Sequence, residues 1–297
     1  MTFTSAGALD VLHAVCVSAS ISDEDATVLQ PPADNAMVAL PKLGLVARIG
    51  VDTSHLARLR QELHVATWLA QNGLATPKPA TSPPTRQLAV EQGRVFTWWE
   101  YLPSRTRTDL PGLMRLLRHL HGLRDPHPEI TTFDPWARIA GQIAAAEGLA
   151  ARDHALLRRR WEVLRGRWSR ARWPNEDHVV IHGDAHLHNT LVYRDRPFLL
   201  DLEDVRLGPW QWDAISPLVH RRAGWISDTE YREAIEAYGR EPADEPDIEL
   251  LVSIRMLRMT CWLASRTGRE PELVGAVRRR INTLQDSNPL GQWASGF

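Results

Sequence analysis

The chain has 297 residues, with 43% hydrophobic and 24% charged side chains, which is typical of a globular protein with one large domain or two smaller ones. A formal net charge of −1 provides no overall basic field, so we expect neither nucleic acid nor an anionic membrane as a partner. No run approaches the ~20 apolar residues that cross a bilayer, so we expect no membrane-spanning helix.

The first residues and the two cysteines favour a cytoplasmic location. The N-terminal stretch has no basic start and carries Asp10 and His13 within its most apolar part, unlike a signal peptide. Cys16 and Cys261 lie far apart without a CxxC spacing, as expected of free buried thiols in a reducing compartment. We expect a cytoplasmic protein that is a monomer or a homodimer.

The first hundred residues predict a few strands and one principal helix. After one short helix within residues 1–25, three short apolar runs between residues 26 and 50 are separated by turn-prone segments and predict an antiparallel meander. Residues 52–74 have a helical spacing of apolar positions, with Thr53 or Ser54 as the cap and Gly73 after the end. Residues 87–103 predict two strands joined by a Gln92-Gly93 turn.

The rest of the chain is largely helical. Helices are expected to begin at Asp109, Asp134 and Asp153, and four more are predicted at about 211–222, 228–239, 246–266 and 271–285. Two strands, at residues 178–182 and 197–203, interrupt this series. We therefore expect an α+β fold with a small mixed lobe at residues 1–100 and a larger, mostly helical lobe at residues 101–297.

The two strands within the helical part enclose a polar segment whose spacing suits phosphoryl transfer. Asp184 and Asn189 are five residues apart, and Asp201 follows twelve residues after Asn189. Phosphoryl transfer needs a carboxylate that receives the proton of the attacking hydroxyl group, and oxygen ligands for Mg²⁺ on the nucleotide phosphates. Asp184 can supply the base, and Asn189 and Asp201 can hold the metal ion.

Three motifs in this region resemble those of the aminoglycoside phosphotransferase and choline kinase-like superfamily, which shares the protein-kinase fold. HGDAHLHN (182–189) matches the HGDxHxxN catalytic loop of that family, LLDLED (199–204) resembles its metal-binding strand end, and GPWQWD (208–213) resembles the segment that follows. The resemblance implies a bilobal kinase-like fold, Mg²⁺, ATP or GTP as co-substrate, and a small molecule with a hydroxyl group as acceptor. It also implies that Asp213 braces the catalytic loop, which His182 and His186 support.

The same resemblance implies a cation and a carboxylate that pair in the first lobe. A cation on the third strand should contact the nucleotide phosphates and pair with a carboxylate of the following helix. Lys42 lies in a turn, whereas Arg48 lies on the strand and Glu62 follows within the helix. The resemblance therefore implies an Arg48–Glu62 pair. Arginine replaces the commoner lysine here, but its guanidinium group can also bind phosphate.

Two other parts of the nucleotide site are less specific. The loop expected to cover the phosphates, LQPPADNAMV, has no glycine, although its backbone N–H groups and Asn35 can still contribute. The segment around Trp99, Glu100 and Tyr101 fits the hinge between lobes, whose backbone groups would hydrogen-bond an adenine or guanine edge. It also fits an edge strand whose tryptophans only pack.

Alternative interpretations of the polar segment remain open. His182, His186 and His188 could form a zinc site, but a fourth ligand is missing nearby. The segment could also be a polar turn between two buried strands. A kinase-fold protein without activity is a third possibility, which is disfavoured because Asp184, Asn189 and Asp201 are all present. A protein kinase is disfavoured because no APE-like segment follows.

The sequence says least about the acceptor. Tryptophans after residue 205 could stack on a ring of the acceptor or belong to the core, namely Trp210, Trp212, Trp225 and Trp262. Residues 228–249 are acidic and could attract a polycationic aminoglycoside, or could be a solvated face. We expect an antibiotic as the first candidate acceptor, and choline, a sugar or an amino-alcohol as the second.

Overall fold

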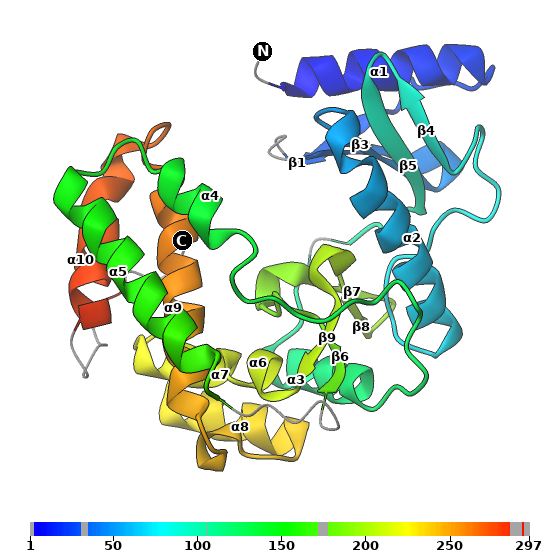
Figure 1. Ribbon diagram of the computed structural model, residues 1–297. Coiled ribbons are helices and arrows are strands. Elements are labelled where there is room, and N and C mark those ends of the chain that lie inside the picture. Colours follow the sequence, from blue (N-terminus) through cyan, green and yellow to red (C-terminus); the bar gives the residue numbers. More distant parts are fainter. Residues whose placement is uncertain (1–2, 31–34, 105, 172–177, 286–292, 294–297) are drawn as a thin grey trace. The chain divides into compact units, whose positions relative to one another are not determined.

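The computed structural model describes residues 3–30, 35–104, 106–171, 178–285 and 293, and these form two compact units (Figure 1). The first, which we call the sheet unit, comprises residues 1–109, 123–131 and 186–205. The second, which we call the helical unit, comprises residues 110–122, 132–185 and 206–297. A mixed α+β fold with an N-terminal antiparallel sheet and a larger helical part is thus confirmed.

The sheet unit is built on a five-stranded antiparallel sheet in the order β1-β2-β3-β5-β4. Its strands are β1 (Thr27–Gln30), β2 (Asn35–Leu40), β3 (Leu45–Gly50), β4 (Leu88–Glu91) and β5 (Arg94–Glu100). The predicted meander and hairpin are both present. Gln92 and Gly93 have positive φ angles of 50° and 73°, the turn geometry that matches the twist of a two-residue hairpin.

Helix α1 (Ser5–Ser18) packs on the sheet. Its buried residues, Ala8, Val11, Leu12, Val15 and Cys16, share one hydrophobic cluster with residues of β2, β3 and β5. Figure 1 shows this helix in blue alongside the strands that it covers. The sheet is therefore buried on this face.

Helix α2 (Leu56–Gln71) follows β3 after one 3₁₀ turn, Thr53–His55. The cap is Asp52, whose carboxylate accepts the N–H of Ser54 at 2.8 Å, so the expected capping by Thr53 or Ser54 is wrong. The cap therefore lies one position before the predicted candidates, because the 3₁₀ turn already begins at Thr53, and aspartate is as good a cap as serine. The helix ends before Gly73, which has a φ of 80°.

The two strands expected around the polar segment do not pair with each other. Strand β6 (His178–Ile181) pairs with β9 (Arg206–Pro209) in the helical unit, and β7 (Thr190–Tyr193) pairs with β8 (Arg196–Leu199) in the sheet unit. The second strand ends at Leu199, and residues 202–204 form a 3₁₀ turn. A simple turn between two buried strands is therefore the wrong interpretation.

The helical unit contains the remaining described helices: α3 (Leu110–His121), α4 (Ile139–Ala144), α5 (Ala151–Trp168), α6 (Gln211–Ala214), α7 (Ser216–Arg222), α8 (Asp228–Tyr238), α9 (Ile248–Ala264) and α10 (Val274–Gln285). Helices α5, α9 and α10 pack together around a core to which α9 contributes most of its length (Figure 1). No helix in the described part of the chain is long and apolar enough to cross a membrane.

Asp134 does not begin a helix, in contrast to the sequence-based expectation. Its carboxylate accepts the N–H of Trp136 at 2.9 Å and closes a turn, and the helix begins only at Ile139. This local hydrogen bond is the alternative that an aspartate side chain offers to a helical backbone. Similarly, α5 begins at Ala151, two residues before the expected start at Asp153.

Two glycines of the helical unit provide a matched test of its packing. A Cβ atom on Gly148 would lie 2.6 Å from the carbonyl oxygen of Thr267, whereas a Cβ atom on Gly141 would meet nothing within 4 Å. We expect Gly148→Ala to lower the free energy of unfolding by about 1–3 kcal/mol, because the backbone of Thr267 must move. We expect Gly141→Ala to be neutral or stabilising by about 0.5–1 kcal/mol, because Gly141 lies within helix α4. Urea denaturation of both variants measures the difference, and equal stabilities would contradict this packing.

Candidate active site

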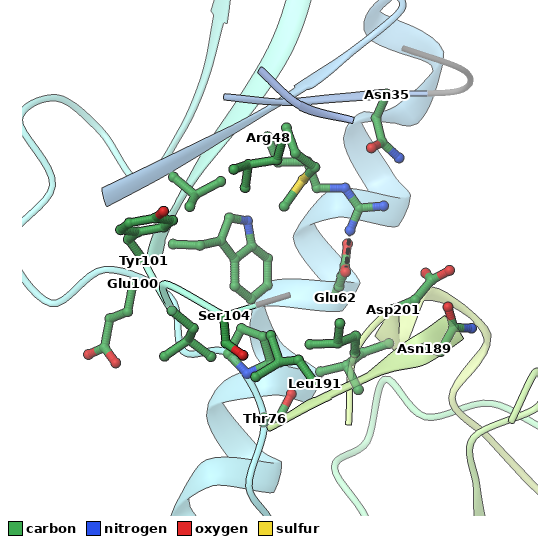
Figure 2. Close-up of a pocket in the computed structure, with 18 of the residues that line it drawn as sticks. Asn35, Arg48, Glu62, Thr76, Glu100, Tyr101, Ser104, Asn189, Leu191 and Asp201 are labelled. Atoms are coloured by element: carbon green, nitrogen blue, oxygen red, sulfur yellow. Dashed lines mark hydrogen bonds and ion pairs between the residues drawn. The ribbon is translucent and has the colours of Figure 1, made fainter. Parts of the chain in front are cut away.

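Arg48 lies at the centre of a buried ion network in the sheet unit. Its guanidinium group, on β3, forms ion pairs with Glu62 of α2 and with Glu203, and Glu203 also pairs with Arg58 of α2. Arg48 and Glu62 are both buried, and Figure 2 shows their side chains meeting end to end. The Arg48–Glu62 pair expected from the resemblance is therefore present. Glu203 was missed, although its place two residues after Asp201 in LLDLED was a signal.

Glu62 and Arg48 leave polar atoms without partners inside the pocket. Burial raises the pKa of the Glu62 carboxyl group, Arg48 opposes this shift, and the nearby Asp201 carboxylate adds to it. Among the described residues, Glu62 Oε2 and Arg48 Nε are buried polar atoms without a hydrogen-bond partner. Polar atoms left unsatisfied in this way are costly, so their presence here fits a site that is completed by a bound ligand.

Asn189 and Asp201 are brought together by the β7–β8 hairpin. Arg194 and Asp195 form its two-residue turn, and at the open end the N–H of Leu200 donates to the carbonyl group of Asn189 at 2.9 Å. Figure 2 shows the side chains of Asn189 and Asp201 beside each other, close to Glu62. Asp201 adopts a left-handed conformation with a φ of 56°, a costly backbone geometry that is often found at functional sites.

The donor set of these two residues fits a Mg²⁺ ion. An amide oxygen and a carboxylate are hard ligands, and Mg²⁺ in nucleotide sites takes only one or two protein ligands besides water and phosphate oxygens. The zinc alternative is not supported, because no three His, Cys, Asp or Glu side chains in the described part of the chain gather closely enough to bind a metal ion. His186 and His188 lie near each other in the sheet unit, with ring centroids 5.7 Å apart.

A pocket of about 590 Å³ in the sheet unit contains these groups and has the size of a small-molecule site. Figure 2 shows that the pocket has two ends with different residues. One end has Asn35, Arg48, Glu62, Asn189 and Asp201, and the other has Glu100 and Tyr101. Apolar side chains also line it, among them Leu29, Met37, Val46, Trp99, Leu191 and Leu200. Residues 31–34 of the glycine-free segment lie outside the described residues.

The backbone of the expected hinge is partly used within the protein. The N–H of Glu100 donates to the carbonyl group of Lys78, and the N–H of Tyr101 donates to that of Gly44, each at 2.9 Å. These two N–H donors are therefore engaged within the protein, and base binding by the remaining backbone groups of the expected hinge stays a prediction. Trp99 is buried on β5 and still lines the pocket, so its ring provides a wall to this cavity.

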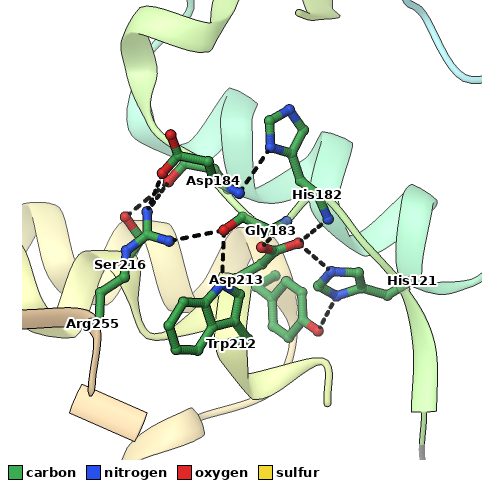
Figure 3. Close-up of polar contacts among 10 residues, drawn as sticks. His121, His182, Gly183, Asp184, Trp212, Asp213, Ser216 and Arg255 are labelled. Atoms are coloured by element: carbon green, nitrogen blue, oxygen red, sulfur yellow. Dashed lines mark hydrogen bonds and ion pairs between the residues drawn. The ribbon is translucent and has the colours of Figure 1, made fainter. Parts of the chain in front are cut away.

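The backbone N–H groups of the catalytic loop are held by Asp213 in the helical unit. The fully buried carboxylate of Asp213 accepts the N–H of His182 at 2.6 Å, the N–H of Gly183 at 3.0 Å and a bond from the His121 ring at 3.1 Å (Figure 3). Burial by itself would raise the pKa of Asp213, but His121 and His182 outweigh burial and lower it. The bracing contact expected from the resemblance is present, and His121, which Tyr238 contacts at 2.7 Å, extends it.

The carbonyl groups of the same loop are held by different side chains. Trp212 Nε1 donates to the carbonyl group of Gly183 at 2.8 Å, and the hydroxyl group of Ser216 donates to that of Ala185 at 3.2 Å. Arg255 contacts both carbonyl groups and the carboxylate of Asp184. Sequence reasoning missed Arg255, although a single arginine within the apolar run LLVSIRML is an unusual feature.

The structure places Trp210, Trp212 and part of the acidic segment less favourably for binding an acceptor, whereas Trp262 is 44% exposed. Trp210 and Trp212 are buried, and Trp210 stacks on Tyr238 with ring centroids 5.5 Å apart. In the acidic segment 228–249, several carboxylates pair with arginines, in the pairs Arg221–Asp228, Arg222–Glu249 and Arg240–Glu245. These contacts favour the core and solvated-face interpretations over an acceptor wall.

Within each unit, the structure brings the predicted residues together. Arg48, Glu62, Asn189, Asp201, Trp99, Glu100 and Tyr101 line one pocket in the sheet unit. In the helical unit, His182 is buried and accepts the N–H of Asp184 at 3.3 Å through its Nδ1 atom. His186 belongs to the sheet unit, where its carbonyl group accepts the N–H of Asn189 at 3.0 Å.

Comparisons with known proteins agree with this geometry. The model of the phosphotransferase enzyme family matches residues 32–251. The fold is similar to that of amicoumacin kinase hAmiN, solved in complex with AMP-PNP, Ca²⁺ and Ami, at a TM-score of 0.72 and 13% identity over 95% of each chain. A microcompartment-associated aminopropanol kinase matches with a TM-score of 0.68 and 19% identity over 92% of this chain and 96% of that one.

An aminoglycoside phosphotransferase from Streptomyces rimosus is also similar, with a TM-score of 0.61 and 17% identity over 86% of this chain and 99% of that one. No curated protein matches the chain by sequence. At these identities the solved structures indicate a common fold.

The lowered pKa of Asp213 predicts a pH dependence of stability. A carboxyl group with a lowered folded-state pKa stabilises the fold above its unfolded pKa, and this contribution is lost as the pH falls through the folded pKa. We expect the free energy of unfolding of wild type to fall more than that of Asp213→Asn between neutral pH and about pH 3. At neutral pH, we expect Asp213→Asn to be less stable than wild type by about 3 kcal/mol, because the buried network is broken.

Unfolding free energies measured across this range test the prediction. Glu249→Gln is the control, since its half-exposed pair with Arg222 should contribute less than about 1 kcal/mol. If the unfolding free energies of wild type and Asp213→Asn changed in parallel with pH, protonation of Asp213 would not be coupled to folding.

Proposed function

Because the chain belongs to the phosphotransferase enzyme family, we propose that it is a Mg²⁺-dependent kinase that transfers the γ-phosphoryl group of ATP or GTP to a hydroxyl group of a small molecule. The observation that carries this proposal is the pocket in which the Arg48–Glu62 pair and the Asn189–Asp201 pair lie together. One pair suits the phosphates of a nucleotide and the other suits the metal ion that accompanies them.

Each group has a distinct role in the proposed reaction. Asp184 accepts the proton of the acceptor hydroxyl group, whose oxygen forms a bond to the γ-phosphorus while the bond to the β-phosphate oxygen breaks and the nucleoside diphosphate leaves. Arg48 binds phosphate oxygens, and Glu62 orients its guanidinium group. Asn189 and Asp201 hold Mg²⁺, which neutralises phosphate charge when it is bound.

The nucleotide site must also bind the base, away from the charged end of the pocket. The apolar lining around Trp99 suits a planar base, and the N–H groups of Glu100 and Tyr101 are already engaged. Polar recognition of the base therefore falls to the remaining groups of the segment that follows β5. Tyr101 and Glu100 are among the residues that line the pocket, which makes them candidates for discrimination between ATP and GTP.

An antibiotic is the first candidate acceptor. The similarity to amicoumacin kinase and to aminoglycoside phosphotransferases supports it, but the pairing of the acidic segment with arginines gives no special attraction for a polycationic drug. A metabolite such as choline, a sugar or an amino-alcohol is the alternative, supported by the similarity to aminopropanol kinase. A catalytically silent binding protein is disfavoured because the catalytic and metal-binding side chains are all present.

Replacement of the proposed base tests the reaction. Purified protein with Mg²⁺ and γ-labelled ATP or GTP should label at least one compound in a panel of aminoglycosides, other antibiotics, choline, sugars and amino-alcohols. We expect Asp184→Asn to reduce the transfer rate by about 10²–10⁴-fold without weakening nucleotide binding, because only the proton acceptor is lost. Asp228→Asn, an exposed acid of the same unit, is the control. An unchanged rate in Asp184→Asn would refute the base assignment, and tight ligand binding without nucleotide consumption would favour the silent binding protein.

The metal-binding role of Asp201 can be tested without an acceptor. Nucleotide affinity of wild type should be higher with Mg²⁺ than with a chelator, and Asp201→Asn should lose most of this difference because one charged ligand is removed. Calorimetric titration with a non-hydrolysable nucleotide measures both affinities. Asp195→Asn, in the turn of the same hairpin, should retain the Mg²⁺ effect. A full Mg²⁺ effect in Asp201→Asn would assign the metal ion to other residues.

A further inference from the structure

The peptide groups of residues 182–185 are held from two sides by opposite charges. On one side the anionic Asp213 accepts the N–H groups of His182 and Gly183. On the other side the cationic Arg255 donates to the carbonyl groups of Gly183 and Ala185, each at 3.3 Å. Each charged side chain therefore meets the end of the peptide dipole that complements it, as Figure 3 shows.

Arg255 is a charged residue in a buried, mostly apolar part of the protein. It is only 6% exposed and lies on helix α9, where most neighbouring positions are apolar. Burying an uncompensated charge costs several kcal/mol, so its donors must find partners. Within the described part of the chain, all of its hydrogen bonds and ion pairs go to residues 183–185, and its guanidinium group lies 5.5 Å from the ring centroid of Trp212.

The third contact of Arg255 reaches the proposed base itself. Its Nη2 atom lies 3.3 Å from Oδ1 of Asp184, whose side chain is 44% exposed and thus open to solvent on its other side. The same Nη2 atom contacts the carbonyl group of Ala185, the next residue. One rigid guanidinium plane therefore fixes the carboxylate relative to the carbonyl groups of Gly183 and Ala185. It does so through two nitrogens held apart in a fixed geometry, whereas a lysine has only one nitrogen.

We propose that Arg255 is a positioning residue for phosphoryl transfer, which holds the carboxylate of Asp184 in the orientation that accepts the proton of the acceptor hydroxyl group. This inference rests on the proposed role of Asp184 as the base. Rate depends steeply on such placement, since a shift of about 1 Å in a reacting group can cost about a hundredfold in rate. Arg255 is not among the residues that line the nucleotide pocket, so its effect should fall on the chemical step.

The test compares the removal of two equally buried arginines. Arg255→Met removes the contacts to the loop, whereas Arg280→Met removes a guanidinium group that is 2% exposed, packs on Trp293 at 4.5 Å and donates to the carbonyl group of Met259 instead. Both substitutions should lower stability. Only Arg255→Met should reduce kcat, by about a hundredfold, with the nucleotide KM changed less than about threefold. Arg255→Lys should recover part of kcat, because the positive charge is kept.

A second readout does not depend on activity. Amide hydrogen exchange in a peptide covering residues 182–186 should become about tenfold faster in Arg255→Met and stay at the wild-type rate in Arg280→Met. Unchanged exchange in Arg255→Met, or faster exchange with an unchanged kcat, would overturn the proposal. If Arg255→Met does not fold, the same two measurements on Arg255→Lys decide, with a wild-type kcat and exchange rate counting against it. If wild type phosphorylates no compound while exchange responds as expected, the proposed function fails and the structural part of the inference stands.

Discussion

Buried ion pairs of arginine organise both units of this protein. In the sheet unit, Arg48 joins three segments that are far apart in the chain: strand β3, helix α2 through Glu62, and the 3₁₀ turn after β8 through Glu203. A buried charge without partners would be too costly to keep, so these segments must lie together whenever the unit is folded. The pocket that we assign to the nucleotide is lined by the residues that this constraint assembles.

Buried charges also find partners in the helical unit, where an anion and a cation each bind different groups of one loop. Asp213 compensates its burial with two backbone N–H groups and His121, and Arg255 compensates its burial with backbone carbonyl groups and Asp184. A loop of polar peptides is ordered in this way without regular secondary structure. Such preorganisation matters for phosphoryl transfer, because positioning and electrostatics supply nearly all of the catalysis.

The chain departs from the common kinase pattern at position 48 and in the glycine-free segment, and the structure gives the first departure a physical explanation. Arginine at position 48 has donors enough to contact Glu62 and Glu203 together, a fork that a lysine would not reproduce. The network therefore links Arg48, the proposed phosphate-binding cation, to the segment that carries Asp201. At the expected hinge, the N–H groups of Glu100 and Tyr101 are engaged within the protein, which leaves the other groups of this segment to contact a base in the proposed site.

The sequence by itself determined the class of fold, the order of most elements and the residues of the proposed chemistry, because these are local properties. Apolar periodicity marks α2 and the β2–β3 meander, and the spacing of Asp184, Asn189 and Asp201 is written along a short stretch of chain. Its errors were also local: the cap at Asp52 and the turn at Asp134 depend on which nearby N–H a carboxylate selects.

Only the tertiary structure decided which distant groups meet. The pairing of β6 with β9, and of β7 with β8, placed the two parts of the polar segment in different units, which no periodicity could indicate. Glu203 and Arg255 gained their roles in the same way, since each is an ordinary charged residue until folding removes it from water. Burial then forces each one to find partners, and those partners are the residues that carry the proposed chemistry.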